Sequence, residues 1–174
     1  MYKRQFPDGA FDALVGGFVL NHLPRVEKAV AEAARVLAPG GRMAVAVWDR
    51  PDRNRLLGEL TAAVRDADVA VRGALPDGPD PYRLADPAEM QALLGACGAT
   101  HTAARSIVLV HEADGVDELW DGLLGGTARI STVLAALPEA TRARVREAFA
   151  ERVAPDGGAV ALEAAVTIGS ATFA

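Results

Sequence analysis

Apolar residues follow two different spacings near the start of the chain. Residues 11–20, FDALVGGFVL, form an almost continuous apolar run, which is typical of a parallel strand covered on both faces. From Val26 to Leu37, apolar side chains recur at the spacing of one helical face. Pro39-Gly40-Gly41 is then expected to stop the helix, and residues 42–49, RMAVAVWD, to form a second buried strand. The pattern predicts a right-handed parallel strand–helix–strand crossover.

The remainder of the chain alternates helical patterns with two further strands. Residues 105–111 are predicted to form a strand, and residues 73–83, with three prolines, a loop. The last stretch, residues 159–174, has alanines that permit a helix, but its Val-Thr-Ile and Thr-Phe steps favour a strand at roughly 162–172. Helices are expected at roughly 52–71, 86–98, 117–124 and 139–152.

Composition narrows the classes of partner. The chain has 174 residues, 51% of them hydrophobic, and a formal net charge of −5. This acidic balance provides no basic footprint for nucleic acid, and the apolar runs are too short to cross a membrane, so we expect neither partner. The single cysteine, Cys97, cannot form an internal disulfide, which favours a cytoplasmic location. We interpret it as a small apolar residue in a helix rather than a reactive thiol.

The first five residues differ in composition from the rest of the chain. Lysine occurs only at Lys3 and Lys28, whereas the other basic residues are arginines. We therefore expect residues 1–5, MYKRQ, to be a non-native leader and residues 6–174 to form one partial domain.

The stretch from Phe6 to Asp49 carries three recognisable steps. An acidic-Gly-apolar-Phe-Asp step precedes the first strand, Asn21-His22-Leu23 follows it, and ARVLxPGGR precedes the second strand. Together they resemble the fourth strand, following helix and fifth strand of class I S-adenosylmethionine (SAM)-dependent methyltransferases that act on small molecules. The resemblance implies an α/β fold: the C-terminal part of a Rossmann-like sheet, with two parallel strands, an antiparallel terminal pair, helices on both faces and a helical lid insertion.

The resemblance also implies SAM as the cofactor and a small molecule as the substrate. A complete member of this family carries a glycine-rich turn after its first strand and an acidic residue after its second, and the sequence contains neither. We therefore expect a C-terminal portion of a methyltransferase, weakly active or inactive by itself. The alternative is a non-enzymatic half-domain that pairs with another chain; a Rossmann-like reductase is disfavoured, because no dinucleotide fingerprint is visible.

By resemblance, Gly17, Phe18 and Val19 lie against the methionine part of SAM, at the carboxyl end of the first strand. The absence of side chains at Gly16 and Gly17 would let a ligand come close, or would instead permit tight packing against a helix.

By resemblance, the position of His22 faces the substrate, and Trp48 is a second candidate because it stands at the end of the second strand. His22 would bind the substrate or accept a proton, and Trp48 would form a wall of the pocket. The alternatives are that Asn21 caps the next helix while His22 merely packs, and that Trp48 is part of the core. No catalytic residue is assigned, because methyl transfer needs mainly alignment of the reacting groups.

Two further expectations concern metals and association. His101 and His111 are far apart in the sequence and have no cluster of further metal-ligating residues beside them, so we expect no metal site. In the family topology the strand that corresponds to residues 12–18 has a neighbouring strand on each side. In this sequence we expect one of these two neighbours to be missing. Residues 12–18 would then be an exposed apolar edge through which the chain associates with itself.

Overall fold

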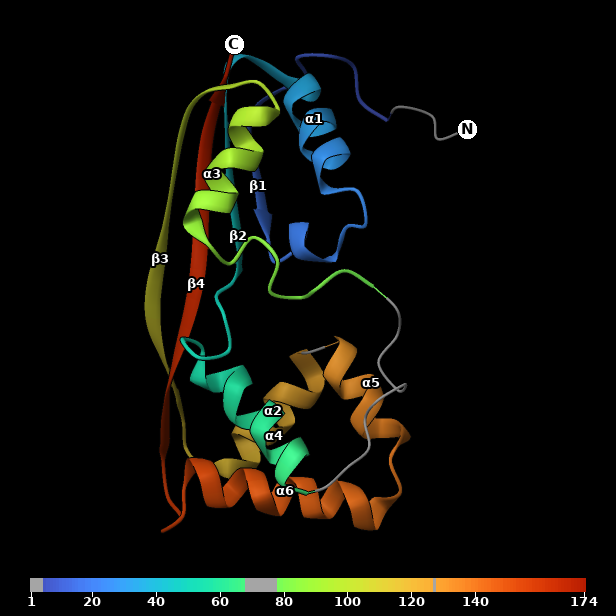
Figure 1. Cartoon of the computed structure of the whole chain (residues 1–174), viewed down its shortest axis with the longest axis vertical. Helices are drawn as coiled ribbons and strands as arrows, with labels where there is room; N and C mark the ends of the chain where they lie inside the picture. The colour runs from blue at the N-terminus through green and yellow to red at the C-terminus, as the bar shows by residue number, and fades with distance from the viewer. Residues whose placement is uncertain (1–4, 68–77, 127) are drawn as a thin grey trace. The chain divides into compact units, whose positions relative to one another are not determined.

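The computed structural model describes residues 5–67, 78–126 and 128–174 (Figure 1). The predicted leader lies almost wholly outside them. The chain divides into two compact units: unit 1 contains residues 1–50, 78–108 and 165–174, and unit 2 contains residues 51–77 and 109–164. The elements, in chain order, are β1 (Phe11–Gly17), the 3-10 helix η1 (Leu20–His22), α1 (Val26–Val36), β2 (Leu37–Trp48), α2 (Arg55–Asp66), α3 (Pro87–Ala96), β3 (Ala99–Ala113), α4 (Val116–Gly126), α5 (Ala128–Ala136), α6 (Glu139–Val153) and β4 (Val160–Phe173).

The four strands form one sheet in the order β1-β2-β4-β3. β1 and β2 are parallel, with register partners running from Phe11 and Leu37 to Gly17 and Ala46. β4 runs antiparallel to β2, from Arg42 opposite Thr172 to Trp48 opposite Val166. Because parallel neighbours need a crossover, α1 connects β1 to β2. The predicted mixed α/β sheet, with its parallel pair and antiparallel last strand, is confirmed.

One face of the sheet in unit 1 is covered by α1 and α3. Their buried side chains pack on alternate residues of β2 and on the end of β4, as the alternation of side chains along a strand requires. Val30, Met90 and Leu94 are fully buried in this cluster. Gly169 in β4 lets α3 come close, because a Cβ there would meet Met90 Cγ at 2.6 Å. Both helices lie on this one face, whereas the sequence suggested helices on both.

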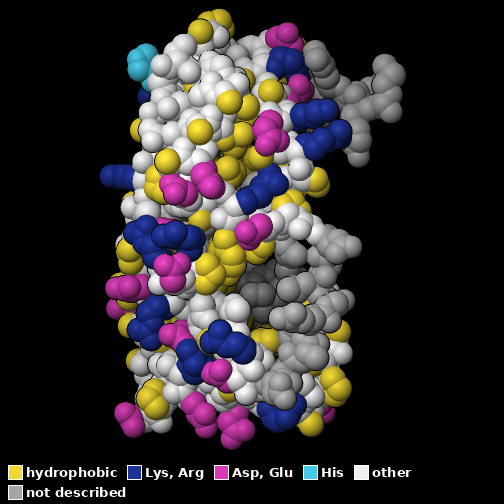
Figure 2. Space-filling view, viewed as in Figure 1, with side chains coloured by type: hydrophobic (Ala, Val, Ile, Leu, Met, Phe, Trp, Pro, Cys, Tyr) yellow, Lys and Arg dark blue, Asp and Glu magenta, His cyan; other side chains and the backbone are white. Residues whose placement is uncertain are grey.

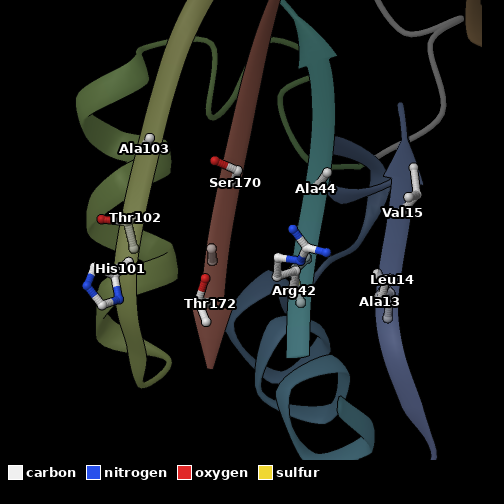
Figure 3. A pocket seen from close by; sticks show the side chains of 12 residues that line it. Ala13, Leu14, Val15, Arg42, Ala44, His101, Thr102, Ala103, Ser170 and Thr172 are labelled. Carbon is white, nitrogen blue, oxygen red and sulfur yellow. The ribbon is translucent and has the colours of Figure 1, made fainter. Parts of the chain in front are cut away.

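The opposite face of the same sheet carries a shallow groove of about 500 Å³ (Figure 3). Residues from all four strands line it, including Ala13, Arg42, His101 and Ser170. β1, which borders the groove, is an edge strand of the sheet, and its Val15 side chain is 83% exposed. The predicted exposure of residues 12–18 therefore agrees with the described residues; the association expected from it is taken up as a prediction in the Discussion.

Unit 2 is built mainly from helices. The side chains of Trp120 in α4 and Phe149 in α6 are buried against each other, with ring centroids 5.8 Å apart. Arg152 at the end of α6 forms salt bridges of 2.8 Å with both Glu59 and Asp66 of α2. These contacts hold α2, α4 and α6 together.

Most predicted elements are present, with different ends. The helix expected at 52–71 is α2, and its predicted residues beyond 67 lie outside the described part, as does much of the loop at 73–83. The glycine stop predicted for α1 is wrong: the helix ends at Val36 because Leu37 is already extended, and Gly40, with φ of +79°, lies within β2. α5 was not expected.

Charged side chains of both signs are interspersed on the face seen in Figure 2. Among the described residues, no helix is long and apolar enough to cross a membrane.

Candidate functional site

The candidate site is at the carboxyl ends of β1 and β2, in unit 1. Phe18 follows β1 directly, and its backbone N–H donates to the carbonyl oxygen of Ala46 at 2.8 Å. Its φ of +54° is in the left-handed region, which L residues with bulky side chains rarely adopt. The Phe18 ring lies against Trp48, with centroids 4.3 Å apart and planes at 32°. The structure thus brings together an expected cofactor residue and an expected substrate residue.

The two glycines before Phe18 differ in their surroundings. A Cβ built on Gly16 would meet Val45 Cγ1 at 3.6 Å, an ordinary contact, whereas a Cβ on Gly17 would meet nothing within 4 Å. Space is therefore open at Gly17, and the packing alternative does not require glycine at either position. Val19, the third expected cofactor residue, is also exposed.

Asn21 is fully buried in η1 and makes a long-range contact. Its Nδ2 donates to the carbonyl oxygen of Pro81 at 3.1 Å and lies 3.4 Å from Nε2 of His22. Its Oδ1 has no hydrogen-bond partner among the described residues. The alternative that Asn21 caps α1 is wrong, because the N-cap of α1 is Arg25, with no side-chain cap bond. The His22 side chain is exposed.

The segment that Asn21 contacts, residues 81–85, is held in an unusual backbone conformation. The hydroxyl of Thr167, a buried residue of β4, donates to the carbonyl oxygen of Ala85 at 2.5 Å. Between the two anchored carbonyl groups, Leu84 has φ of +67°. Nε and Nη2 of Arg83 are buried without a hydrogen-bond partner. Sequence reasoning missed this segment, because nothing in its composition shows that it meets a residue 60 positions earlier.

The arrangement suits binding and alignment more than acid–base chemistry. Phe18 and Trp48 offer an aromatic surface, and Gly17 leaves space beside it. Within the described ranges, no group of three or more His, Cys, Asp or Glu side chains could hold a metal ion. Ligands of open α/β sheets bind beyond the carboxyl ends of the strands, which is where these residues lie. They fit one side of a cofactor site, the side expected from the resemblance.

Comparisons with known proteins identify similar methyltransferases. Residues 1–45 match the family described as "Methyltransferase domain". The chain is 58% identical over 36 residues to a ubiquinone/menaquinone biosynthesis C-methyltransferase UbiE of Methylobacterium nodulans, and 38% identical over 73 residues to that of Azotobacter vinelandii. These matches cover 21% and 42% of this chain, and the chain spans only 14% and 28% of the two relatives.

Among solved structures, the YcgJ protein of Bacillus subtilis aligns with 98% of this chain and 67% of its own, at 19% identity and a TM-score of 0.46. The family match, residues 1–45, falls on the part of the chain that contains β1, α1 and most of β2. The predicted resemblance to class I SAM-dependent methyltransferases of the small-molecule type is therefore confirmed.

Proposed function

We propose that the intact protein transfers a methyl group from SAM to a small-molecule acceptor. SAM would supply a methyl group bonded to a positively charged sulfur, and Gly17, Phe18 and Val19 would form one wall of its site. The observation that carries the proposal is the Phe18–Trp48 pair: two aromatic rings in contact at the ends of adjacent parallel strands, beside open space at Gly17. The left-handed backbone of Phe18 adds support, since such conformations gather at binding sites.

Few reactive side chains are needed for this reaction. Methyl transfer proceeds by in-line displacement, so the protein has mainly to align the acceptor atom with the methyl group. His22 is exposed in η1, four residues after Phe18, and we propose that it contacts the acceptor or takes up its proton. Trp48 would form part of the acceptor wall. The relatives are named as quinone C-methyltransferases, which makes a ring-bearing acceptor and C-methylation the first combination to test.

Binding of the product analogue S-adenosylhomocysteine tests the wall directly. The chain has two tryptophans, so the indole N–H signal of Trp48 can be followed by NMR while Trp120, buried in unit 2, serves as an internal control. We expect weak binding that shifts the Trp48 signal and leaves Trp120 unchanged. Gly17→Val should abolish the shift, because it fills the open space. An unchanged Trp48 signal at saturating ligand would contradict the proposal.

The affinity for S-adenosylhomocysteine tests whether the main cofactor-binding loop is missing. Because the sequence contains no glycine-rich turn after a strand, we expect an affinity well below that of a complete enzyme. A micromolar dissociation constant, measured by calorimetry, would overturn the interpretation that the main cofactor loop is missing.

The second candidate function is a half-domain that binds another chain. The open groove on the sheet and the exposed strand β1 favour it, since such surfaces recruit partners. The test is co-expression with the reading frame directly upstream. Co-purification of a protein that has a strand followed by a glycine-rich turn would support this function, and two proteins that separate on a sizing column would contradict it.

A further inference from the structure

Three buried polar atoms, one in η1 and two in the segment 81–85, have no hydrogen-bond partner among the described residues. Asn21 Oδ1 is buried and lacks a donor, and Arg83 Nε and Nη2 are buried and lack an acceptor. The bond from Asn21 to the Pro81 carbonyl places the two segments in contact, and Arg83 lies two residues beyond that carbonyl. Buried polar atoms are nearly always paired, so these three need an explanation.

The backbone around this contact is strained on both sides. Phe18 and Leu84 are the non-glycine residues with positive φ among the described residues. Phe18 lies two residues before the start of η1, and Leu84 directly follows Arg83. Such conformations are energetically costly and persist where the surroundings enforce them, typically at ligand-binding sites. Here the enforcement is visible: Asn21 anchors the Pro81 carbonyl, and Thr167 anchors the Ala85 carbonyl. The structure thus holds the backbone of this segment in place and leaves Nε and Nη2 of Arg83 without an acceptor.

We infer that Arg83 and Asn21 form a binding site for an acid group that has a hydrogen-bond donor beside it, as α-amino and α-hydroxy acids have. A guanidinium offers several N–H groups in a plane, which matches the two oxygens of a carboxylate. The carboxylate would pair with Nε and Nη2 of Arg83, and the adjacent amine or hydroxyl would donate to Oδ1 of Asn21. One ligand of this kind would supply a partner for each of the three unpaired atoms and a negative charge for the half-buried guanidinium of Arg83.

Two sources could present this chemistry near the Phe18–Trp48 pair. One is the amino-acid end of the cofactor, and the other is the methyl acceptor. The inference extends the proposed function, but it can fail separately from it. The Trp48 signal reports on the aromatic wall, whereas dependence on Arg83 reports on the acid site.

The first experiment uses small acids as probes of the full-length chain. Glycolate and glycine, followed by NMR titration, should shift the backbone signals of residues 81–85 and the side-chain amide of Asn21. Acetate, which lacks the adjacent donor, should bind more weakly. Arg83→Met should weaken glycolate binding by about tenfold or more, because it removes a charged hydrogen-bond pair. Arg83→Lys should recover part of the binding, since it restores the charge without the planar fork.

Arg65→Met is the matched control, because Arg65 is an exposed arginine of unit 2 whose ion-pair distance to Asp66 is 3.9 Å. It should leave glycolate binding unchanged. Thermal unfolding of each variant shows whether the fold survives; if Arg83→Met does not fold, Arg83→Lys supplies the comparison.

The second experiment identifies the source. If Arg83→Met weakens binding of S-adenosylhomocysteine but not of 5′-methylthioadenosine, which lacks the amino-acid end, the site holds the cofactor. If both nucleosides bind as before and only glycolate and glycine are lost, the site holds the acceptor. If none of these affinities depends on Arg83, or if Arg65→Met has the same effect, the inference is overturned.

Discussion

Gly41 and Gly17 lie in neighbouring strands but differ in what a side chain would meet. A Cβ on Gly41 would lie 2.7 Å from the carbonyl oxygen of Ala38 and 3.0 Å from Cβ of Leu37. Gly41→Ala should therefore lower the free energy of unfolding by about 1–3 kcal/mol, because backbone atoms have to move. Gly17→Ala should change it by less than about 0.5 kcal/mol, since nothing lies within 4 Å. Urea unfolding of both variants measures the difference, and equal stabilities would contradict the prediction.

Cys97 should react slowly with alkylating reagents. Burial of the thiol, followed by the nearby negative charge of Glu27, raises the pKa of Cys97 above its ordinary value. Because the thiolate is the reactive form, a raised pKa leaves less of it at pH 8 than in a free thiol. The rate of reaction with iodoacetamide should rise at a higher pH in the folded chain than in urea. Glu27→Gln should move that rise partly back, and identical pH profiles for folded and unfolded chain would count against the raised pKa.

Single residues also show how far sequence reasoning reaches into the site. The meeting of Phe18 and Trp48 follows from the pattern, because neighbouring parallel strands bring their carboxyl ends to one edge. The burial of Asn21 does not follow, since a helix cap is the ordinary role of an asparagine at that position. Its actual partner, the Pro81 carbonyl, lies 60 residues away. Local patterns therefore predict the Phe18–Trp48 side of the candidate site, but they miss the segment 81–85 that contacts Asn21.

At the scale of elements, the start of α3 is the sharpest sequence signal. Asp86 is the N-cap, and its side chain accepts a hydrogen bond from the Ala88 N–H at 2.8 Å, with Pro87 at the first helical position. Asp86→Ala should cost about 1 kcal/mol of stability, because a helical N–H loses its partner. Asp86→Asn is the control, since asparagine caps equally well. Thermal unfolding separates them, and an equal loss in both variants would show that the cap bond contributes little.

Helices were predicted correctly where the local helix preference of the residues agrees with their packing in the folded chain. α1, α3 and α6 carry helix formers at the right spacing, and each is present. α5 contains Thr132 and Val133, whose branched side chains disfavour a helix locally. Its Val133 and Leu134 are 4% and 1% exposed, so tertiary packing outweighs the weak local preference. β3 extends well beyond the predicted 105–111. The prediction was too short because the residues at both ends of β3 show no apolar strand pattern.

At the scale of the whole molecule, the exposed edge of β1 is where we expect two copies of the chain to meet. Phe11, Val15 and Phe18 are exposed along it, and Asp12 is the only charged residue of the strand. We predict that the chain associates with a second copy through residues 12–18, by antiparallel pairing. That arrangement sets the two Asp12 carboxylates at opposite ends of the new ladder, whereas parallel in-register pairing would place them side by side.

Val15→Lys tests this association, because charged side chains are how natural sheets protect their edges. The substitution should shift the chain from dimer toward monomer in sedimentation velocity, at little cost in stability, since Val15 is 83% exposed. Val108→Lys on β3, the strand at the other end of the sheet, is the matched control and should leave the association intact, although Val108 is also 52% exposed. A wild-type chain that sediments as a monomer at all concentrations, or a dimer broken equally by both variants, would contradict pairing through β1.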